Sequence, residues 1–571
     1  MSQISPAATI QIIPAHGRYF YLKQRKKSDI LELSKKRRRG SSHEQREMEF
    51  RILFQTGHAV VIEMLNYGVY FTNKEYTIFV DGQEVLTSKK VIQTIYGLNP
   101  DTEYTIQVKS TDGADVSEPV KVKTNYEFVT LDVRQFGAKG DGEHDDTIFI
   151  QAAINACPKD GRVLVPAGTY RTSALFLKDD LVLEFAEGAT LLAFTDRAKF
   201  PILPGLIPST DGEKEYNLGT WEGDPEDMFA SILTGINVKN IVITGAGVLD
   251  GNSSYENWWE GNGREKVGGA YRPRMIFLNH CENVVVHGLR VQNSPAWNLH
   301  PYFSDHLRYL DLEIINPKIS PNTDGIDPES VDGLEIAGVH FSLGDDCIAV
   351  KSGRFYMGHK YKKSSQHMEI RQCYMQHGHG SVTLGSEMAA GVKHLTVKDC
   401  IFEDTDRGLR VKTRRGRGND AVIEDITFEN IKMEGVLTPF VVNSFYWCCD
   451  PDGHSEYVRS KEPLPVDERT PFIRELYFKD IEAHNCHVAA TFIYGLPEAK
   501  IDKLTFENVH VDFTENPTPE YPAMMADVEP CTKKGIYINN VKELIMKNVT
   551  VEGAEGEPVE ILNVDKVTRE D

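Results

Sequence analysis

From about residue 238 to residue 553, short runs of alternating apolar and polar residues recur along the chain and end at Gly, Asn or Asp. The runs begin mostly every 23 to 35 residues, with longer gaps where loops would be inserted. A recurring unit of one or two short strands is typical of a solenoid, in which successive coils stack strand upon strand. The pattern favours a parallel β-helix over a propeller, because it contains no regular four-strand blade. The recurring units are residues 238–252, 281–294, 304–317, 331–345, 365–378, 392–405, 421–435, 473–485, 501–513 and 541–553.

A stretch of helical periodicity precedes these coils, at "DDTIFIQAAINACPKDG", residues 145–161. Ile148, Ile150, Ala153 and Ile154 follow a pair of aspartates at helical spacing. We predict a helix here that caps the open end of the first coil, since an uncovered strand edge would pair with other chains.

Residues 46–125 have a different pattern, that of a small antiparallel β domain. "YTIFVDGQEV" predicts a hairpin that turns at Asp81-Gly82. "LNPDTEY", residues 98–104, resembles the tyrosine corner of a fibronectin type III sandwich, in which the phenol of Tyr104 would bond back to the chain. The predicted fold is therefore all-β: a small fibronectin type III-like β-sandwich followed by a right-handed parallel β-helix at 126–571. Residues 1–45 are rich in Lys and Arg without periodicity, which predicts a solvated, poorly ordered segment.

The composition of the chain restricts the classes of partner that it can bind. The chain has 84 Asp and Glu against 63 Lys and Arg, a formal charge of -21, which argues against nucleic acid as the main partner. We expect no membrane association and a cytoplasmic location, because the first residues do not read as a signal peptide and no apolar run is long enough to span a bilayer; a removed export signal would instead leave a secreted or periplasmic protein. The nine scattered cysteines contain no CxxC pair, so we expect reduced, mostly buried thiols and no zinc site.

Acidic and basic side chains concentrate on consecutive coils. Because strands of a β-helix lie in register, polar residues at the strand ends of neighbouring coils should meet on one surface. A cluster of carboxylates raises the pKa of its members until one keeps a proton. This arrangement suits glycoside hydrolysis, in which a protonated acid serves the leaving oxygen and an ionised partner activates water. The residues on the four coils are Asp324 and Asp327, then Asp345 and Asp346, then His377 and His379, then Arg410 and Lys412.

The last of these coils predicts the charge of the substrate. Arg410 and Lys412 are two residues apart on a strand, so their side chains point to the same face. A guanidinium and an ammonium together would bind a sugar carboxylate, which indicates a uronic-acid substrate.

In these motifs the sequence resembles the polygalacturonases, family 28 of the glycoside hydrolases, over roughly residues 130–565. Four family motifs occur in order: Asn-Thr-Asp at 322–324, Gly-Asp-Asp at 344–346, Gly-His-Gly at 378–380 and Arg-x-Lys at 410–412. The resemblance implies that Asp345 is the general acid, that Asp324 and Asp346 position and deprotonate water, and that His379 tunes the acid. It also implies that Arg410 and Lys412 bind the substrate carboxylate, that the reaction inverts the anomeric centre, and that no metal or cofactor is needed.

Further residues are expected around the substrate, which would be polygalacturonate or its oligomers. The loop-rich insertions at 252–281 and 436–473 and the N-terminal module resemble exo-acting bacterial members of the family, which would release galacturonate or digalacturonate from the non-reducing end. Inserted loops would close one end of the groove into a pocket. The additional candidates for substrate contact are Asn322, Arg415, Tyr494 and His300; an aromatic platform would come from Trp258, Trp259, Trp297, Tyr446 or Trp447.

Several alternatives remain open from the sequence. An endo-polygalacturonase, or a relative that acts on rhamnogalacturonan or xylogalacturonan, would share the same four motifs. A calcium-dependent pectate lyase would share the fold but needs an acidic calcium cluster and a catalytic arginine. A non-catalytic polysaccharide-binding β-helix would explain the coils but not the ordered motifs. The oligomeric state is not readable from the sequence.

Overall fold

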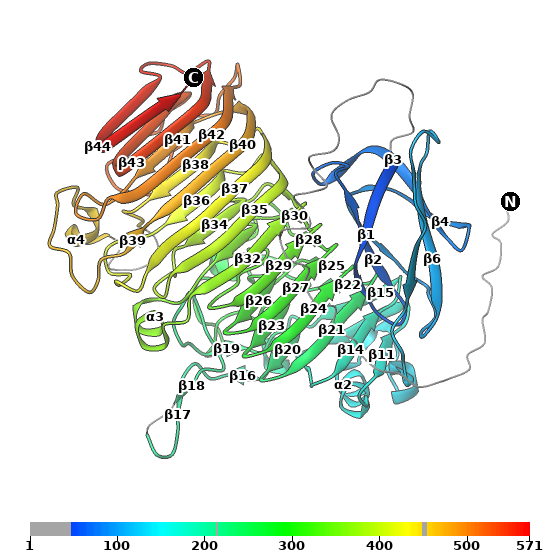
Figure 1. Ribbon diagram of the computed structural model, residues 1–571. Coiled ribbons are helices and arrows are strands. Elements are labelled where there is room, and N and C mark those ends of the chain that lie inside the picture. Colours follow the sequence, from blue (N-terminus) through cyan, green and yellow to red (C-terminus); the bar gives the residue numbers. More distant parts are fainter. Residues whose placement is uncertain (1–46, 213–214, 448–453, 571) are drawn as a thin grey trace.

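The chain folds into a right-handed parallel β-helix with a smaller β module along its side (Figure 1). This computed structural model describes residues 47–212, 215–447 and 454–570. The basic segment predicted at 1–45 lies outside the described residues. Within the described ranges, no helix has the length and apolar character needed to cross a membrane.

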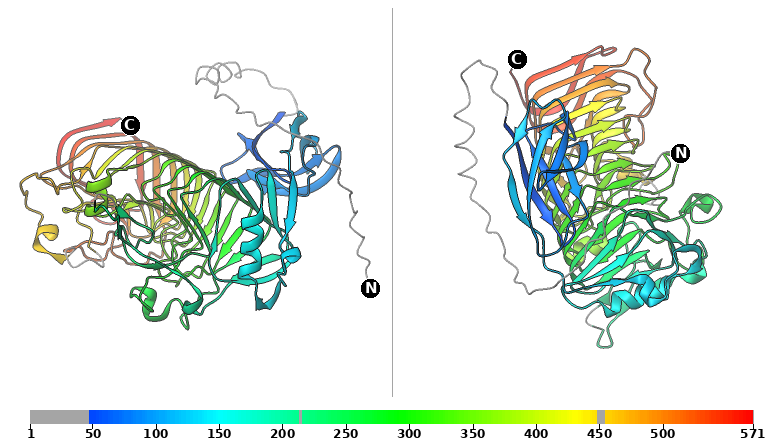
Figure 2. Two further views of the ribbon diagram at one scale, coloured as in Figure 1. Left: turned by 90° about the horizontal axis from the view of Figure 1, so that it is seen from below. Right: turned by 90° about the vertical axis from the view of Figure 1, so that its right-hand side faces the viewer.

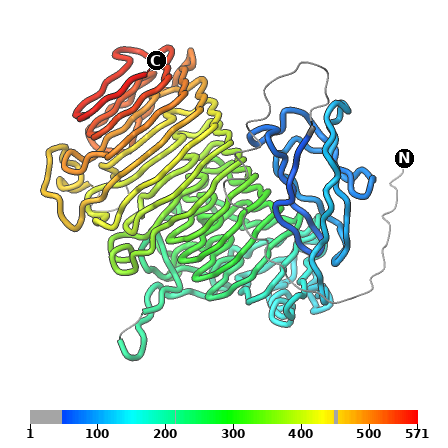
Figure 3. Tube along the Cα trace, viewed as in Figure 1, coloured from blue at the N-terminus to red at the C-terminus, as the bar shows by residue number. Residues whose placement is uncertain are grey.

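Three stacks of parallel strands form the coils, and Figure 3 follows the chain through them. The first stack contains β14 (Leu181–Phe185), β21 (Lys239–Gly245), β24 (Glu282–His287), β27 (Asp305–Leu310), β29 (Asp332–Ala337), β32 (Ser365–Arg371), β35 (Val392–Glu403), β37 (Val422–Glu434), β40 (Glu475–Cys486), β42 (Ile501–Phe513) and β43 (Lys534–Glu552). The second contains β15 (Ala189–Ala193), β22 (Val248–Asp250), β25 (Arg290–Gln292), β28 (Glu313–Ile315), β30 (His340–Ser342) and β33 (Tyr374–Gln376), and it merges into β35. The third contains β13 (Leu175–Phe176), β20 (Leu233–Ile236), β23 (Ile276–Asn279), β26 (Leu299–Tyr302), β31 (Ile348–Val350), β34 (Val382–Gly385), β36 (Arg407–Lys412), β38 (Thr438–Asn443) and β41 (Ala489–Tyr494).

The register between coils is fixed by columns of buried aliphatic side chains. In the first stack, one inward position is apolar in every coil, and each of its side chains is paired with the equivalent position above and below. A register slip of one residue would turn all of these side chains outward, so the hydrophobic interior holds the coils in alignment. The column runs through Leu181, Ile241, Val284, Leu307, Leu334, Met368, Leu395, Ile426, Leu476, Leu504 and Leu544.

The first coil is covered as the sequence predicts, with one exception. It contains β9 (Val129–Asp132), β10 (Asp141–Asp145), β11 (Gly161–Val165) and β12 (Gly168–Thr172), and helix α2 (Thr147–Ala156) packs on it. Ile150, Ala153 and Ile154 are buried in the β-helix core. Ile148 was predicted on the same face but is 70% exposed. At 100° per residue it lies on the side of the helix opposite Ile150, so the helical spacing of the buried residues does not include Ile148.

The module is built mostly from antiparallel strands, and its third and fourth strands form the predicted hairpin. The strands are β1 (Glu47–Gln55), β2 (Val60–Leu65), β3 (Phe71–Val80), β4 (Gln83–Lys90), β5 (Ile92–Ile95), β6 (Glu103–Ser110), β7 (Val116–Ser117) and β8 (Val120–Lys123). Asp81 and Gly82 both have positive φ, as a tight two-residue hairpin turn requires. The Tyr104 hydroxyl accepts a 2.9 Å hydrogen bond from the backbone N–H of Asn99, which is the predicted backward contact of the phenol.

The module is docked firmly on the first stack of the β-helix (Figure 2). Outward side chains of β24, β27 and β29 join the module's own hydrophobic core. Asp311 is buried in this contact and accepts from Lys90 Nζ at 2.5 Å, from the Thr94 N–H at 2.8 Å and from the Thr94 hydroxyl at 2.7 Å. Arg371 is also buried there, and its guanidinium bridges Glu63 of the module and Glu335 of the β-helix. Hydrophobic burial and paired charges therefore fix the module to the coils.

We expect Asp311→Ala to lower the free energy of unfolding by about 1–3 kcal/mol, because the buried N–H of Thr94 and the Lys90 ammonium lose their acceptor. Chemical denaturation and limited proteolysis of the 111–128 region would measure this effect. Asp425→Ala is a matched control, since Asp425 has the same positive φ but is an exposed residue. Equal losses in the two variants would mean that the backbone change, and not the docking contact, determines stability.

Candidate active site

The third stack brings the four motif-bearing coils to one place. Ile326 bridges to Ile348, which is paired in turn with Val382 of β34, and Val382 is paired with Leu409 of β36. Backbone bonds continue this register just before each strand: the Gly325 N–H donates to the Asp346 carbonyl at 3.0 Å. Side chains that precede the strands in successive coils therefore project from one edge of the stack.

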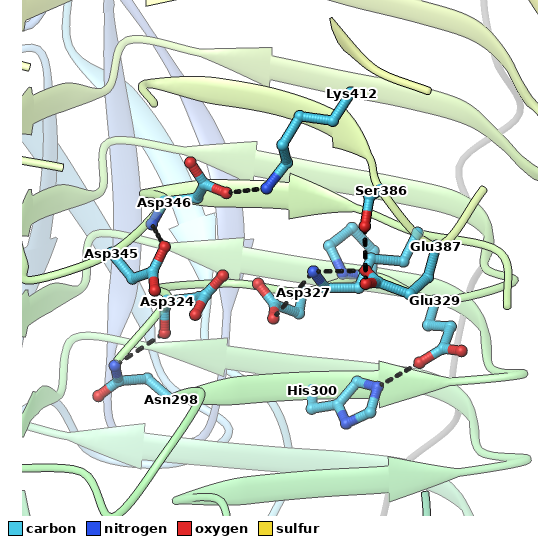
Figure 4. A network of polar contacts seen from close by, with 12 residues as sticks. Asn298, His300, Asp324, Asp327, Glu329, Asp345, Asp346, Ser386, Glu387 and Lys412 are labelled. Carbon is cyan, nitrogen blue, oxygen red and sulfur yellow. Dashed lines mark hydrogen bonds and ion pairs between the residues drawn. The ribbon is translucent and has the colours of Figure 1, made fainter. Parts of the chain in front are cut away.

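Three carboxylates meet at this edge (Figure 4). One oxygen from each of Asp324, Asp345 and Asp346 lies within 4.8 Å of the other two. The backbone N–H of Asp346 donates to Asp345 Oδ1 at 2.9 Å, which orients the first carboxylate of the pair. Asp324 and Asp346 are buried and Asp345 is half-buried, so the three groups interact with little screening by water.

Asp346 is the carboxylate that two cations hold ionised. Lys412 Nζ donates to its Oδ2 at 2.7 Å and Arg410 Nη1 to its Oδ1 at 3.1 Å. Burial opposes ionisation of Asp346, but the charges of Lys412 and Arg410 outweigh it and hold its pKa well below the ordinary range. Arg410 and Lys412 are themselves buried, at 6% and 8% exposure, and they come from the coil predicted to carry them.

Asp345 is paired with His379 on the next coil. The ring Nδ1 of His379 lies 3.1 Å from Asp345 Oδ1, and the imidazole is half-exposed. The Asp345 charge raises the pKa of His379. Burial raises the pKa of Asp345, but the charge and hydrogen bond of His379 outweigh burial, so the Asp345 pKa lies below its usual value.

Among the described residues, Asp324 lacks a cation or histidine partner of the kind that Asp346 and Asp345 have. Burial, followed by the charges of Asp327 and Asp345, raises its pKa well above the ordinary value. Among the three carboxyl groups, Asp324 therefore keeps a proton most readily in this structure.

A second charged network lies beside the carboxylates, on the outward face of the same stack (Figure 4). Asp327 and Glu329 are fully buried, and burial raises the pKa of each to about 8. Lys351 Nζ lies 3.2 Å from Glu387 and 3.9 Å from Asp327. His300, predicted to contact substrate, belongs to this network: its Nε2 is 3.0 Å from Glu329 and the side chain is fully buried. The prediction of a substrate contact for His300 was wrong, because the aromatic wall described next covers it.

The aromatic wall consists of Trp221, Tyr271, Trp297 and the guanidinium of Arg274. Trp221 stacks on Tyr271 and on Trp297, and Arg274 lies over the rings of both tryptophans at 4.7 and 4.6 Å. Most of the wall comes from the irregular insertions before β23 and not from the coils. Sequence reasoning missed Trp221 and Tyr271, since long-range packing between insertions leaves no periodic signal.

Arg272 connects this wall to the first motif. Its Nη2 donates to Asn322 Oδ1 at 2.7 Å, and its Nη1 donates to the carbonyls of Pro295 and Pro321. Asn322, predicted to bind substrate, therefore uses its side-chain oxygen to hold the turn that carries Asp324.

Arg415 was predicted to bind substrate, but it holds a loop instead. Its guanidinium is 1% exposed and pairs with Glu498 at 2.6 and 2.9 Å. Its remaining donors reach the carbonyls of Tyr457, Ser460 and Glu462, around helix α4 (Glu456–Arg459). The prediction failed because alternation along the strand does not continue past Lys412, where the chain turns into the loop.

Tyr494 and Trp447 lie on the side of the later coils. Tyr494 is half-buried in the same column as Lys412, two coils further on, and packs against Phe445 at 4.9 Å between ring centroids. Trp447 lines a cavity of about 430 Å³ together with His379, Arg407, Arg410 and the 520–527 segment. Trp258, Trp259 and Trp297 are buried, which excludes them as exposed sugar platforms.

Comparisons with known proteins identify families and relatives that are similar to this chain. Residues 199–459 match the family model described as glycosyl hydrolases family 28, and residues 130–183 match the model rhamnogalacturonase A/epimerase, pectate lyase-like. A probable polygalacturonase of Vitis vinifera is 28% identical over 403 residues, which cover 69% of this chain and 76% of that protein. An exo-poly-alpha-D-galacturonosidase of Dickeya chrysanthemi is 27% identical over 423 residues, which cover 64% of this chain and 66% of that protein.

Solved structures share the fold. The family 28 exopolygalacturonase of Yersinia enterocolitica superposes with a TM-score of 0.66 at 21% identity, covering 91% of this chain and 98% of that one. The exopolygalacturonase of Thermotoga maritima gives a TM-score of 0.61 at 24% identity, covering 75% and 93%. All four motifs lie within residues 199–459, the part of the chain that matches glycosyl hydrolases family 28, and the two solved structures share the fold of the chain.

Proposed function

We propose that this protein is an exo-acting polygalacturonase that hydrolyses α-1,4-galacturonosyl linkages from the non-reducing end of polygalacturonate or its oligomers. The observation that carries the proposal is the set of three carboxylates within 4.8 Å beside the paired cations Arg410 and Lys412. Carboxylates supply both proton transfers of glycoside hydrolysis, and the cations supply a binding site for a uronate. The names of the Dickeya and Yersinia relatives support the same substrate class and the exo mode.

The charge states suggest how the proton transfers are divided. Asp345 is the most exposed of the three carboxylates and is the proposed donor of a proton to the glycosidic oxygen, with the proton supplied from within the carboxylate cluster. As the bond from the anomeric carbon to the leaving oxygen breaks, a water attacks that carbon and gives its proton to an ionised carboxylate. Asp346 is held ionised by its two cations before the attack, and it is the proposed acceptor of the water proton, with Asp324 holding the water.

The aromatic wall supports the exo mode. The cations lie on coils that follow the carboxylates, whereas Trp221, Trp297 and Arg274 cover the coils that precede Asp324. Asp327 and Glu329 face outward beside Asp324 and would border an open groove, yet both are fully buried. A chain end would therefore stop against the wall.

The opposite side has room for the rest of the substrate. The cavity lined by Trp447 and Arg410 has a volume typical of small-molecule sites, roughly 300–1,000 Å³. Its further charged residues, Arg407 and Asp406, could discriminate the next sugar unit by charge. The remainder of the polymer would extend across the later coils.

Digestion of polygalacturonate in the presence of a chelator tests this function. We expect galacturonate or digalacturonate as the first products with a slow loss of viscosity, and Asp345→Asn should lower kcat by about 10²–10⁴-fold. Asp332→Asn is the control. Asp332 lies on the first stack, which carries the module, so this change should leave kcat unchanged. An early ladder of oligomers would contradict the exo mode. Products with a new double bond would indicate a lyase, and no products from any pectin would indicate a binding protein.

The anomeric form of the first product is a separate test. We propose inversion, on the basis of the resemblance to family 28, so proton NMR should detect the β-anomer before mutarotation. The result is informative because the distance between the two catalytic carboxyl groups usually differs between the two kinds of glycosidase. It is about 6.5–9.5 Å in inverting enzymes and about 5 Å in retaining enzymes. Here the nearest oxygens lie within 4.8 Å. Initial α-anomer would show that the spacing rule holds and that a covalent intermediate forms.

The pH profile of His379→Gln identifies the acid. His379 lowers the pKa of Asp345, so removing it should raise that pKa and keep Asp345 protonated to higher pH. If Asp345 donates the proton, the alkaline limb of kcat/KM should move to higher pH, even though the rate falls. His394→Gln, a change to another half-exposed histidine paired with an aspartate, is the control. An unmoved limb would assign the proton donation to Asp324 instead.

A further inference from the structure

A cluster of metal-ligating side chains lies far from the carboxylate site, on the later coils. His484 is on β40, and His510 and Asp512 are on the adjacent strand β42. Ala483 and Val511, which alternate with these residues, are buried in the core, so the three polar side chains point outward. One ligand atom from each of the three lies within 4.8 Å of the other two.

We propose that His484, His510 and Asp512 form a binding site for Zn²⁺ that links two neighbouring coils. Two imidazoles and a carboxylate are a ligand set that zinc prefers, with a water as the fourth ligand. Asp512 Oδ2 lies 2.6 Å from His484 Nδ1 and 3.6 Å from His510 Nε2. Ligand atoms about 2.1 Å from a tetrahedral ion are about 3.4 Å apart, so small side-chain rotations would complete the site.

Hydrogen bonds hold His510 and Asp512 in the orientation that metal binding needs. The other ring nitrogen of His510, Nδ1, bonds to the Thr550 hydroxyl at 2.7 Å, which leaves Nε2 directed at Asp512. The other oxygen of Asp512, Oδ1, accepts the Asn485 N–H at 2.7 Å. The other nitrogen of His484, Nε2, lies 3.8 Å from Glu482. Metal-bound histidines characteristically have their second nitrogen held by an oxygen in this way.

A second histidine pair shows what an ordinary surface arrangement looks like in this protein. His367 and His394 stack with 5.2 Å between ring centroids, also on neighbouring coils. Each of them bonds to a separate aspartate, His367 to Asp332 at 2.7 Å and His394 to Asp425 at 2.8 Å. Two imidazoles directed at one carboxylate are therefore a particular property of the His484 cluster and do not follow from coil stacking alone.

Binding exchanges a proton for the ion. The hydrogen bond between His484 and Asp512 contains one proton, which leaves to solvent as the ion takes its place. The ion then joins β40 to β42, next to the last coils, where β44 (Val559–Glu570) is largely exposed. We therefore expect the ion to stabilise the open C-terminal end of the solenoid.

Calorimetric titration of chelator-treated full-length protein with ZnCl₂ tests the site. We expect one high-affinity Zn²⁺ per chain, a loss of affinity of at least 10-fold in His510→Ala, and a 10-fold or smaller loss in Thr550→Val, which removes only the orienting hydroxyl. His394→Ala is the matched control and should bind Zn²⁺ like the parent. Hydrogen exchange of residues 475–552 should slow when the ion is bound.

Two outcomes would overturn the proposal. Absence of binding at 100-fold molar excess of Zn²⁺ would show that the cluster is only a set of ion pairs. Binding that survives His484→Ala with His510→Ala, but is lost in Asp345→Asn, would place the ion at the carboxylates of the active site. Since His484, His510 and Asp512 are partly exposed and lie on β40 and β42, outside the carboxylate site, failure here leaves the proposed hydrolase activity unaffected.

Discussion

The in-register stacking of coils is the constraint on which the rest of this structure depends. A continuous column of buried aliphatic side chains, from Leu181 to Leu544, aligns each coil with the next and specifies which residues face outward. Asp324, Asp346 and Arg410 are separated in sequence, but alignment at Ile326, Ile348, Val382 and Leu409 brings them to one edge. The arrangement of the proposed catalytic residues is thus a consequence of hydrophobic packing inside the solenoid.

The neighbouring charges then give the three aspartates different protonation states. Three aspartates share one small volume, and the cations beside them are distributed unevenly. Asp346 has both Arg410 and Lys412, Asp345 has a partly exposed histidine, and Asp324 has carboxylates for neighbours. An ionised carboxylate next to a protonated one is what acid–base hydrolysis requires, and here it follows from which coil supplies the cations.

Local and periodic features of the fold could be predicted from the sequence, whereas contacts between insertions could not. The repeat of the coils, the hairpin at Asp81-Gly82 and the four ordered motifs each depend on residues that are close together in the sequence. Arg415 and His300 were misassigned because their surroundings come from distant segments: Glu498 and the 456–462 loop around Arg415, and the tryptophan wall over His300. Ile148 shows the same limit on a smaller scale, since an apolar residue near a helical pattern need not lie on its buried face.

The net charge of the protein makes Arg410 and Lys412 necessary for the proposed binding of an anionic substrate. At -21 the protein repels a polyanion at long range, and at physiological ionic strength this repulsion is screened beyond about 8 Å. A chain with a carboxylate on every sugar is therefore attracted only where cations are local and desolvated, as Arg410 and Lys412 are. Both cations are already paired with Asp346, so a sugar carboxylate must share them with it. In the proposed function, binding of the substrate would weaken the cations' hold on Asp346 and make it a stronger base at the moment when water must be deprotonated.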